Sequence, residues 1–298
     1  MIRIKTPAKI NLFLEVTRKR EDGFHELETL FAKVGIYDEI IFEKKRYGGF
    51  TLTVNGKIPG GNGSFKQNII YKAAMKFYEA FPDVKPAADI VLNKNIPVGG
   101  GLGGGSSDGA AALLGLCKLH DVDPHTYKVR LHNIAAELGS DVPFFLLKGP
   151  AAIGRGRGEI LEPVAMQGRL PYLILAYPPK PSFTAEAYGK LKLGRKEEIS
   201  ENLEKMSKIV ESLKNGTFVP SEAPLFNRLE SSVLPGREDI QEIKEMLLAA
   251  GSEAAMMTGS GATCFGLASS QRKAEKIADY MSQNRELRVF VAPFADIP

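Results

Sequence analysis

The sequence has only two cysteines, Cys117 and Cys264, among its 298 residues. Two cysteines are too few for the disulfide framework of a small secreted domain. No stretch approaches the roughly 20 apolar residues that a membrane-spanning helix needs. The N-terminus carries Arg3, Lys5 and Lys9 among its apolar residues, so it has no signal-peptide core. We therefore expect a cytoplasmic protein that has no membrane partner.

The sequence also lacks a strong excess of charge of either sign. Its net charge is +4 and its pI is about 8.8, which suits anionic small-molecule ligands or weak nucleic-acid contact. The segment Lys44-Lys45-Arg46 follows a strand-like stretch, which indicates a solvated turn. A length of 298 residues suggests two domains and is sufficient for a sizeable core.

Glycine, by contrast, is abundant. There are 30 glycines, against roughly 21 at the average usage of about 7%. Six of them lie in residues 99–105, and Gly259 and Gly261 add two more. Ordering so flexible a segment costs entropy, which is hard to justify unless its backbone approaches a ligand closely.

The glycine-rich segment runs directly into Ala110-Ala111-Ala112-Leu113-Leu114, a strong helix start. Such a loop presents unpaired N–H groups and the positive end of a helix dipole to an anion. Ser106 and Ser107 add hydroxyls that either cap the helix or reach a phosphate or metal. The segment is not a Walker A loop, because no Gly-Lys-Ser/Thr follows. A flexible linker is the alternative, which the adjoining helix disfavours. The pattern predicts a phosphate-binding loop.

The first half of the chain is rich in predicted strands. Alternating apolar residues predict a strand over residues 10–16. Further strands are predicted at 29–34, 39–43, 50–54 and 89–92, with a turn at 60–63 and a strand pair within 151–161. Helices are predicted after an N-cap at Asn68, at 107–120 and at 125–138.

The second half predicts a different arrangement. Strands are predicted at 172–177, 254–258, 263–267 and 287–291, and helices at 184–191, 200–213, 238–250 and 271–283. This order is that of a split β-α-β plait. We place the domain boundary near residues 167 and 168, which gives domains 1–167 and 168–298. The predicted class is α+β in two domains.

Phosphate chemistry needs a base or a charge that positions the acceptor hydroxyl, and Asp141 and Lys9 are candidates. Asp141 follows a predicted helix end at Gly139 and is either the N-cap of a short turn or a partly desolvated catalytic acid. Lys9 is either an exposed strand lysine or a functional cation. His25 follows a turn and is either an ordinary histidine or a ligand contact. Residues 258–263 form either a tight hairpin or a second loop that contacts a ligand.

Taken together and in order, residues 7–16, 97–107 and 258–263 resemble the three motifs of the GHMP kinases. That family is named for galactokinase, homoserine, mevalonate and phosphomevalonate kinases. The resemblance implies an N-terminal ATP-binding domain of the ribosomal-protein-S5-domain-2-like type and a ferredoxin-like C-terminal domain. It also implies an ATP-dependent small-molecule kinase that uses ATP and Mg²⁺.

One pair of segments resembles a particular branch of that family. Pro7-Ala8-Lys9-Ile10-Asn11-Leu12, followed by Asp22-Gly23-Phe24-His25-Glu26-Leu27, is similar to the branch that acts in the non-mevalonate isoprenoid pathway. Those enzymes phosphorylate a hydroxyl of a cytidine diphosphate conjugate of methylerythritol. The small-molecule partner expected from this resemblance is therefore that conjugate.

The resemblance also implies roles for individual residues. Asp141 would accept the proton of the substrate hydroxyl, and Lys9 would hold that hydroxyl and Asp141 and stabilise charge. His25 would hydrogen-bond the cytosine edge, while Phe24 and Tyr188 would sandwich its ring. Phe24 stands where the family usually has tyrosine, so a hydroxyl is lost. Asn11 would contact substrate near Lys9, and Ser107 would contact Mg²⁺ or phosphate. The residues implied to wrap the ATP phosphates are Pro97, Val98, Gly99, Gly100, Gly101, Leu102, Gly103, Gly104, Gly105, Ser106 and Ser107.

Two other functions stay open from the sequence. One is another GHMP kinase, such as a homoserine or mevalonate kinase, which Phe24-His25 after Asp22-Gly23 disfavours. The other is a nucleic-acid-binding module built on the C-terminal plait. Strands 254–258 and 263–267 carry only Phe265 and no arginine or lysine, which argues against a nucleic-acid surface. Either a monomer or a homodimer is compatible with the sequence.

Overall fold

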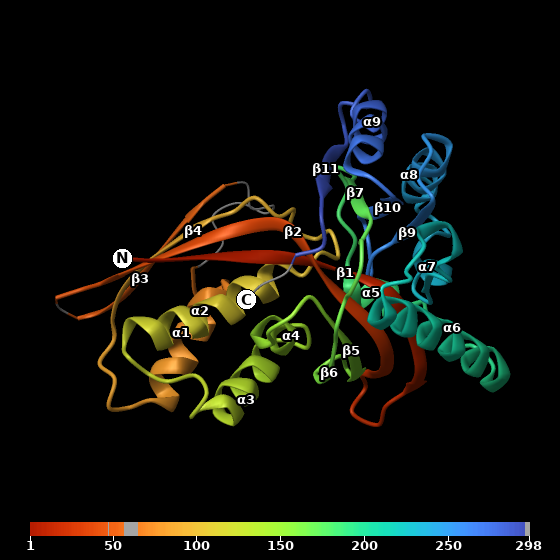
Figure 1. Cartoon of the computed structure of the whole chain (residues 1–298). Helices are drawn as coiled ribbons and strands as arrows, with labels where there is room; N and C mark the ends of the chain where they lie inside the picture. Colours follow the sequence, from red (N-terminus) through yellow and green to blue (C-terminus); the bar gives the residue numbers. More distant parts are fainter. Residues whose placement is uncertain (47, 57–64, 296–298) are drawn as a thin grey trace. The chain divides into compact units, whose positions relative to one another are not determined.

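The computed structural model describes residues 1–46, 48–56 and 65–295 (Figure 1). The turn predicted at 60–63 lies outside the described residues. The chain forms two compact units whose segments alternate along the sequence. Unit 1 comprises Met1–Ala8, Ile36–Val98 and Gly103–Lys148, and unit 2 comprises Lys9–Gly35, Gly99–Leu102 and Gly149–Pro298. The proposed boundary at residues 167 and 168 stays a prediction.

Two long strands, β1 (Ile2–Lys19) and β2 (His25–Lys44), run through both units. The prediction of separate strands at 29–34 and 39–43 is wrong, because β2 continues through Gly35 without a turn. Close packing against Pro293 explains why residue 35 is glycine. Its N–H donates to the Pro293 carbonyl, and an added Cβ would lie 3.2 Å from the Pro293 ring.

The sheet of unit 1 is formed by β3 (Gly49–Asn55), β4 (Ala87–Asn93) and the C-terminal part of β2, and β1 is the next strand beside β2. β3 is parallel to β4, and β4 is antiparallel to β2 at Glu39–Lys44. The helical elements are η1 (Phe65–Gln67), α1 (Ile69–Ala80), α2 (Gly104–Leu119), α3 (Lys128–Leu138) and α4 (Val142–Leu146). Figure 1 shows the helices of this unit on one side of its strands.

Two local features of unit 1 explain how its helices form and pack. The side chain of Asn68 accepts a hydrogen bond from the Ile70 N–H at 2.8 Å, which confirms the predicted N-cap of α1. A Cβ at Gly115 of α2 would lie 2.3 Å from the Phe42 ring of β2. Glycine at this position therefore allows α2 to approach the sheet closely.

Unit 2 contains strand pairs and a separate four-stranded sheet. β1 pairs in parallel with β8 (Phe226–Asn227), β2 pairs with β5 (Ala151–Gly156), and β5 pairs with β6 (Ile160–Val164). The separate sheet has the order β11 (Arg288–Ala292), β7 (Tyr172–Tyr177), β10 (Cys264–Ala268), β9 (Ala254–Met257). Its helices are α5 (Thr184–Gly189), α6 (Lys196–Asn215), η2 (Pro220–Glu222), α7 (Glu230–Val233), α8 (Glu238–Ala249) and α9 (Gln271–Met281). This arrangement confirms the predicted β-α-β plait, and the α+β class holds for the chain.

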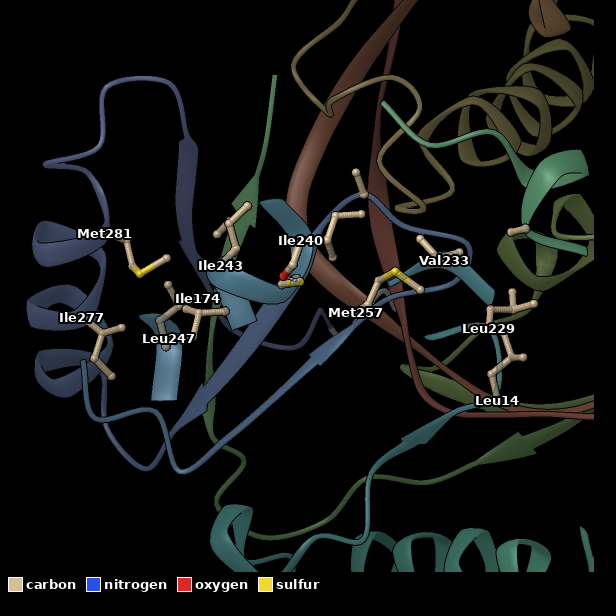
Figure 2. Packing of buried hydrophobic residues seen from close by; sticks show 14 of the residues in the cluster. Leu14, Ile174, Leu229, Val233, Ile240, Ile243, Leu247, Met257, Ile277 and Met281 are labelled. Carbon is tan, nitrogen blue, oxygen red and sulfur yellow. Dashed lines mark hydrogen bonds between the residues drawn. The ribbon is translucent and has the colours of Figure 1, made fainter. Parts of the chain in front are cut away.

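A hydrophobic cluster holds the four-stranded sheet and its helices together (Figure 2). Ile174 of β7 packs with Ile243 and Leu247 of α8 and with Ile277 of α9. Full burial of each such side chain contributes about 1.5–3 kcal/mol. The same cluster extends to further buried side chains of β1, of the two ends of α7 and of the end of β9: Leu14, Leu229, Val233 and Met257. The cluster therefore fixes the backbone that enters residues 258–263.

None of the helices among the described residues combines the length and the apolar character that crossing a bilayer requires.

Candidate active site

Strand β1 carries Lys9 and Asn11, and both side chains are buried, with exposed fractions of 4% and 1%. The alternative of an exposed strand lysine is therefore excluded. The Lys9 ammonium donates to Asn11 Oδ1 at 2.8 Å and lies 5.3 Å from the centre of the Phe31 ring. The Asn11 amide nitrogen in turn donates to Thr29 Oγ1 at 2.8 Å. Burial of a cation costs free energy, which contacts such as these with an amide oxygen and a ring partly offset.

Residues 258–263 form a tight turn between β9 and β10, with the Thr258 N–H donating to the Thr263 carbonyl at 3.0 Å. This turn also reaches strand β1, because Thr258 Oγ1 accepts from the Asn11 N–H at 3.0 Å. The Thr263 N–H donates to the Gly100 carbonyl at 3.2 Å. These residues therefore form the tight hairpin that was the first alternative. Because the hairpin contacts both Asn11 and the glycine-rich loop, it is compatible with the second alternative, a loop that contacts a ligand, which stays a prediction.

The structure supplies internal reasons for most glycines of that loop. Gly99, Gly101 and Gly103 have positive φ angles of 75°, 74° and 66°. A Cβ at Gly100 would lie 2.7 Å from Thr263 Oγ1, and one at Gly104 would lie 2.8 Å from an Ile96 methyl group. The expectation that only a ligand would justify these glycines is wrong for these five positions. A Cβ at Gly105, by contrast, would meet open space.

The N-terminus of α2 has a polar group suited to a ligand. Its N-cap, Gly103, has no capping side chain, so neither Ser106 nor Ser107 caps the helix. Ser107 is 1% exposed, and its Oγ has no hydrogen-bond partner among the residues that the structure describes. A buried hydroxyl without a partner costs about 1–3 kcal/mol. A ligand oxygen or a cation at this helix terminus would remove that cost.

A buried charge cluster, which the sequence analysis missed, holds the segment before the loop. The Lys94 ammonium pairs with Asp38 and lies 2.9 Å from an oxygen of Asp108. Thr6 Oγ1 donates to Asp108 at 2.9 Å, and Asp38 accepts from the Ile96 N–H at 2.8 Å. Burial raises the pKa of Asp108 to about 7, although Lys94 opposes this. The sequence did offer one indication of this cluster, because the oppositely charged Lys94 and Asp108 flank the glycine-rich loop.

Asp141 lies in the short connection between α3 and α4. Gly139 ends α3, its N–H donating to the Ala135 carbonyl, and the Val142 N–H donates back to Gly139. Asp141 occupies the N-cap position of α4, but its side chain makes no capping bond. The carboxylate is half-buried. The N-cap alternative thus predicted the position of Asp141 correctly, but the side-chain capping bond that it implies is not formed.

Aromatic rings meet near the start of β2. The His25 ring stacks on Tyr188, with ring centres 5.1 Å apart and an angle of 29° between their planes. Phe24 is 52% exposed, and the Arg157 guanidinium lies 4.8 Å from its ring centre. Burial, with a smaller effect of Lys19, lowers the pKa of His25, so its imidazole is neutral near pH 7. A neutral imidazole offers one donor and one acceptor. The expected sandwich of a base between Phe24 and Tyr188 stays a prediction.

Comparison with known proteins identifies the class. Residues 68–149 match the family model described as the GHMP kinases N terminal domain, and residues 198–286 match the GHMP kinases C terminal model. The 4-diphosphocytidyl-2-C-methyl-D-erythritol kinase of Macrococcus caseolyticus (strain JCSC5402) is 36% identical over 280 residues, covering 94% of each chain. The chain belongs to the GHMP kinase family. It is therefore an ATP-dependent small-molecule kinase.

Two solved structures of the same fold are also similar to this chain. The crystal structure of a 4-(cytidine 5'-diphospho)-2C-methyl-D-erythritol kinase is 32% identical, with a TM-score of 0.77, and covers 99% of this chain and 100% of its own. A homoserine kinase from Cytophaga hutchinsonii has a TM-score of 0.76 at 18% identity, over 99% of this chain and 95% of its own. The second similarity shows the fold alone. The first similarity, at more than 30% identity over nearly the whole chain, is to a 4-(cytidine 5'-diphospho)-2C-methyl-D-erythritol kinase.

Proposed function

We propose that this protein transfers a phosphoryl group from ATP to the 2-hydroxyl of 4-diphosphocytidyl-2-C-methyl-D-erythritol, in the non-mevalonate isoprenoid precursor pathway. The observation that carries the proposal is the full-length similarity to kinases of that name. The neutral His25 stacked on Tyr188 supports it, because this pair suits a nucleobase. Another GHMP kinase activity, on homoserine or mevalonate, is the weaker alternative.

Phosphoryl transfer depends mainly on positioning and electrostatics, so few protein groups need to react. In this proposal Asp141 accepts the proton of the attacking hydroxyl. Lys9 supplies a buried positive charge that stabilises the negative charge of the transferred group. Asn11 contacts the substrate and holds the Lys9 ammonium at 2.8 Å.

The phosphates of ATP bind to residues 97–107 in this proposal. The uncapped start of α2 provides N–H groups and the positive end of the helix dipole. Gly105 leaves room for a phosphate next to the backbone. The Ser107 hydroxyl, buried and without a described partner, supplies a further polar contact.

In this proposal Mg²⁺ binds beside the ATP phosphates at the start of α2. Among the described residues, no group of three histidine, cysteine or acidic side chains gathers to hold a metal. Mg²⁺ in kinases is commonly held by substrate phosphates and one or two protein ligands, so Ser107 would be the protein ligand here. The ion supplies charge neutralisation of the phosphates when bound.

The cytidine end of the substrate binds to His25, Phe24 and Tyr188 in this proposal. His25 hydrogen-bonds the edge of the cytosine, and the rings of Phe24 and Tyr188 stack on the two faces of the cytosine. The Arg157 guanidinium over Phe24 holds that ring although the ring has no hydroxyl of its own.

Further parts of the proposal concern partners and location. We propose a cytoplasmic enzyme, monomeric or homodimeric, that does not bind nucleic acid. Phe265, the one aromatic residue of β9 and β10, is fully buried and therefore does not present a ring to a base.

The test is incubation of the purified protein with ATP, Mg²⁺ and 4-diphosphocytidyl-2-C-methyl-D-erythritol. We expect a product heavier by one phosphoryl group, detected by mass spectrometry, and no product when EDTA removes the metal. Homoserine and mevalonate serve as competing acceptors under the same conditions. Phosphorylation of either one, with the cytidine compound left unchanged, would overturn the proposed substrate.

His25→Ala is expected to raise KM for the cytidine substrate about tenfold, because one or two hydrogen bonds to the base are lost. The KM for ATP should not change. His132→Ala is the matched control, since His132 is also half-buried and has no proposed role. Steady-state kinetics with each substrate varied in turn measures both values. An equal rise for ATP and the cytidine substrate would contradict the assignment.

A further inference from the structure

Strand β8 consists of two residues, and the second, Asn227, was not identified from the sequence. β8 lies parallel to β1, with Phe226 opposite Phe13 and Asn227 opposite Leu14. Asn227 is 4% exposed. A polar side chain at such a place needs hydrogen-bond partners, and those partners indicate what it does.

The amide of Asn227 makes three hydrogen bonds. Its Nδ2 donates to the carbonyls of Met257 and Gly259, both at 2.8 Å. Its Oδ1 accepts from the Leu229 N–H at 3.0 Å. A primary amide provides the two donors and one acceptor that this position requires. Asn227 thereby holds the backbone on both sides of Thr258.

Thr258 connects this amide to the buried lysine. Its Oγ1 accepts from the Asn11 N–H at 3.0 Å and lies 3.5 Å from Asn11 Oδ1. Asn11 Oδ1 is the atom that accepts from the Lys9 ammonium at 2.8 Å. Gly259 also lies against this ammonium, because a Cβ added there would be 3.4 Å from Lys9 Nζ. All these residues belong to unit 2.

Attachment of β8 to β1 does not depend on Asn227. The Arg228 N–H donates to the Leu14 carbonyl at 2.8 Å, and the Arg228 guanidinium binds both oxygens of the buried Glu15 at 2.7 and 2.8 Å. Leu229 and Met257 also pack in the cluster shown in Figure 2. These contacts secure the segment, so the amide is left to determine the position of the turn at Thr258.

We propose that Asn227 is a positioning residue for phosphoryl transfer. It holds the turn 257–259 so that Thr258 fixes Asn11, and Asn11 fixes the Lys9 ammonium. The inference rests on the proposed function, because it assigns Lys9 to the reaction. Asn227 touches neither substrate nor ATP, and its effect passes through Lys9.

The experiment compares Asn227→Ala with Asn202→Ala. Asn202 is a matched control, since it is 2% exposed and its amide donates to Glu15 at 2.7 Å in the same unit. We expect Asn227→Ala to lower kcat about 10- to 100-fold with little change in either KM, because small displacements of a catalytic group have effects of this size. Asn202→Ala should lower Tm to a similar extent and leave kcat nearly unchanged. Asn227→Ser, which keeps one donor, serves if the alanine variant does not fold.

A double-mutant cycle with Lys9→Ala separates positioning from general destabilisation. If Asn227 acts through Lys9, Asn227→Ala should lower the single-turnover rate less than about threefold when Lys9 is already absent. Equal losses in both backgrounds would overturn the inference. A large loss of kcat in Asn202→Ala would overturn it as well.

A wild-type enzyme that leaves the cytidine substrate unphosphorylated would overturn the proposed function, but it would not show whether Asn227 holds Lys9 in position. Crystal structures of the wild type and of Asn227→Ser then decide on Asn227. We expect the Lys9–Asn11 contact of 2.8 Å to be lost in the variant. An unchanged contact would overturn the inference.

Discussion

Asp141→Asn is expected to lower kcat by about 10²–10⁴-fold, which is the range of general-base catalysis. The amide keeps the size of the carboxylate but does not accept a proton from the substrate hydroxyl. The fold should be retained, because asparagine and aspartate are equally good at an N-cap position and Asp141 makes no capping bond. Initial rates at saturating ATP and substrate, together with Tm, measure the two effects.

Asp89→Asn provides the comparison for Asp141→Asn. Asp89 of β4 is another half-buried carboxylate of unit 1, and it pairs with Lys45. We expect this variant to keep nearly full turnover. Turnover close to that of the wild type in Asp141→Asn, or an equal loss in both variants, would exclude Asp141 as the base.

Gly101→Ala is expected to lower kcat/KM for ATP at least about 100-fold, because the loop and its neighbouring turn do not both keep their positions. Gly101 has a φ of 74°, which costs an alanine about 1–2 kcal/mol. Its Cβ would also lie 2.4 Å from the Thr258 carbonyl oxygen and 3.0 Å from that of Gly261. Both atoms belong to backbone, so the collision is relieved only by moving the loop or the turn. Steady-state kinetics with ATP varied, together with Tm, measures the effect.

Gly105→Ala separates the fold of the loop from its contact with phosphate. A Cβ there meets open space in the free protein, and alanine in a helix stabilises by about 0.5–1 kcal/mol relative to glycine. We therefore expect an unchanged or higher Tm and a raised KM for ATP. Wild-type kinetics in Gly105→Ala would show that phosphate does not approach this position, and wild-type kinetics in Gly101→Ala would contradict the steric effect.

Local sequence patterns predicted most of the secondary structure. The strand β7 has the predicted bounds, and α1 starts at the predicted N-cap Asn68. These signals are local, because periodicity and capping involve residues within a few positions of each other. Strand β8 escaped prediction because two residues carry no periodicity, and its pairing with β1 joins positions about 210 apart in sequence. Helix α4 has five residues and is equally short of a pattern.

Interactions between distant residues account for what the sequence did not show of the candidate site. The motifs pointed to Lys9 and the glycine-rich loop, but spacing alone left the exposure of Lys9 open. Its burial follows from packing beside Asn11 and Phe31. Asn227 was not recognised because its partners, Met257 and Gly259, are 30 and 32 residues away.

By itself, the sequence determined most of the strands and helices, the split β-α-β order and the resemblance to GHMP kinases, since each depends on residue types at short or ordered spacings. Its scarcity of cysteine and of long apolar runs excluded a disulfide framework and predicted no membrane-spanning helix. The tertiary structure alone decided which side chains are buried and which glycines are required by close packing. Burial and steric contact depend on chain segments far apart in sequence, which no local pattern encodes.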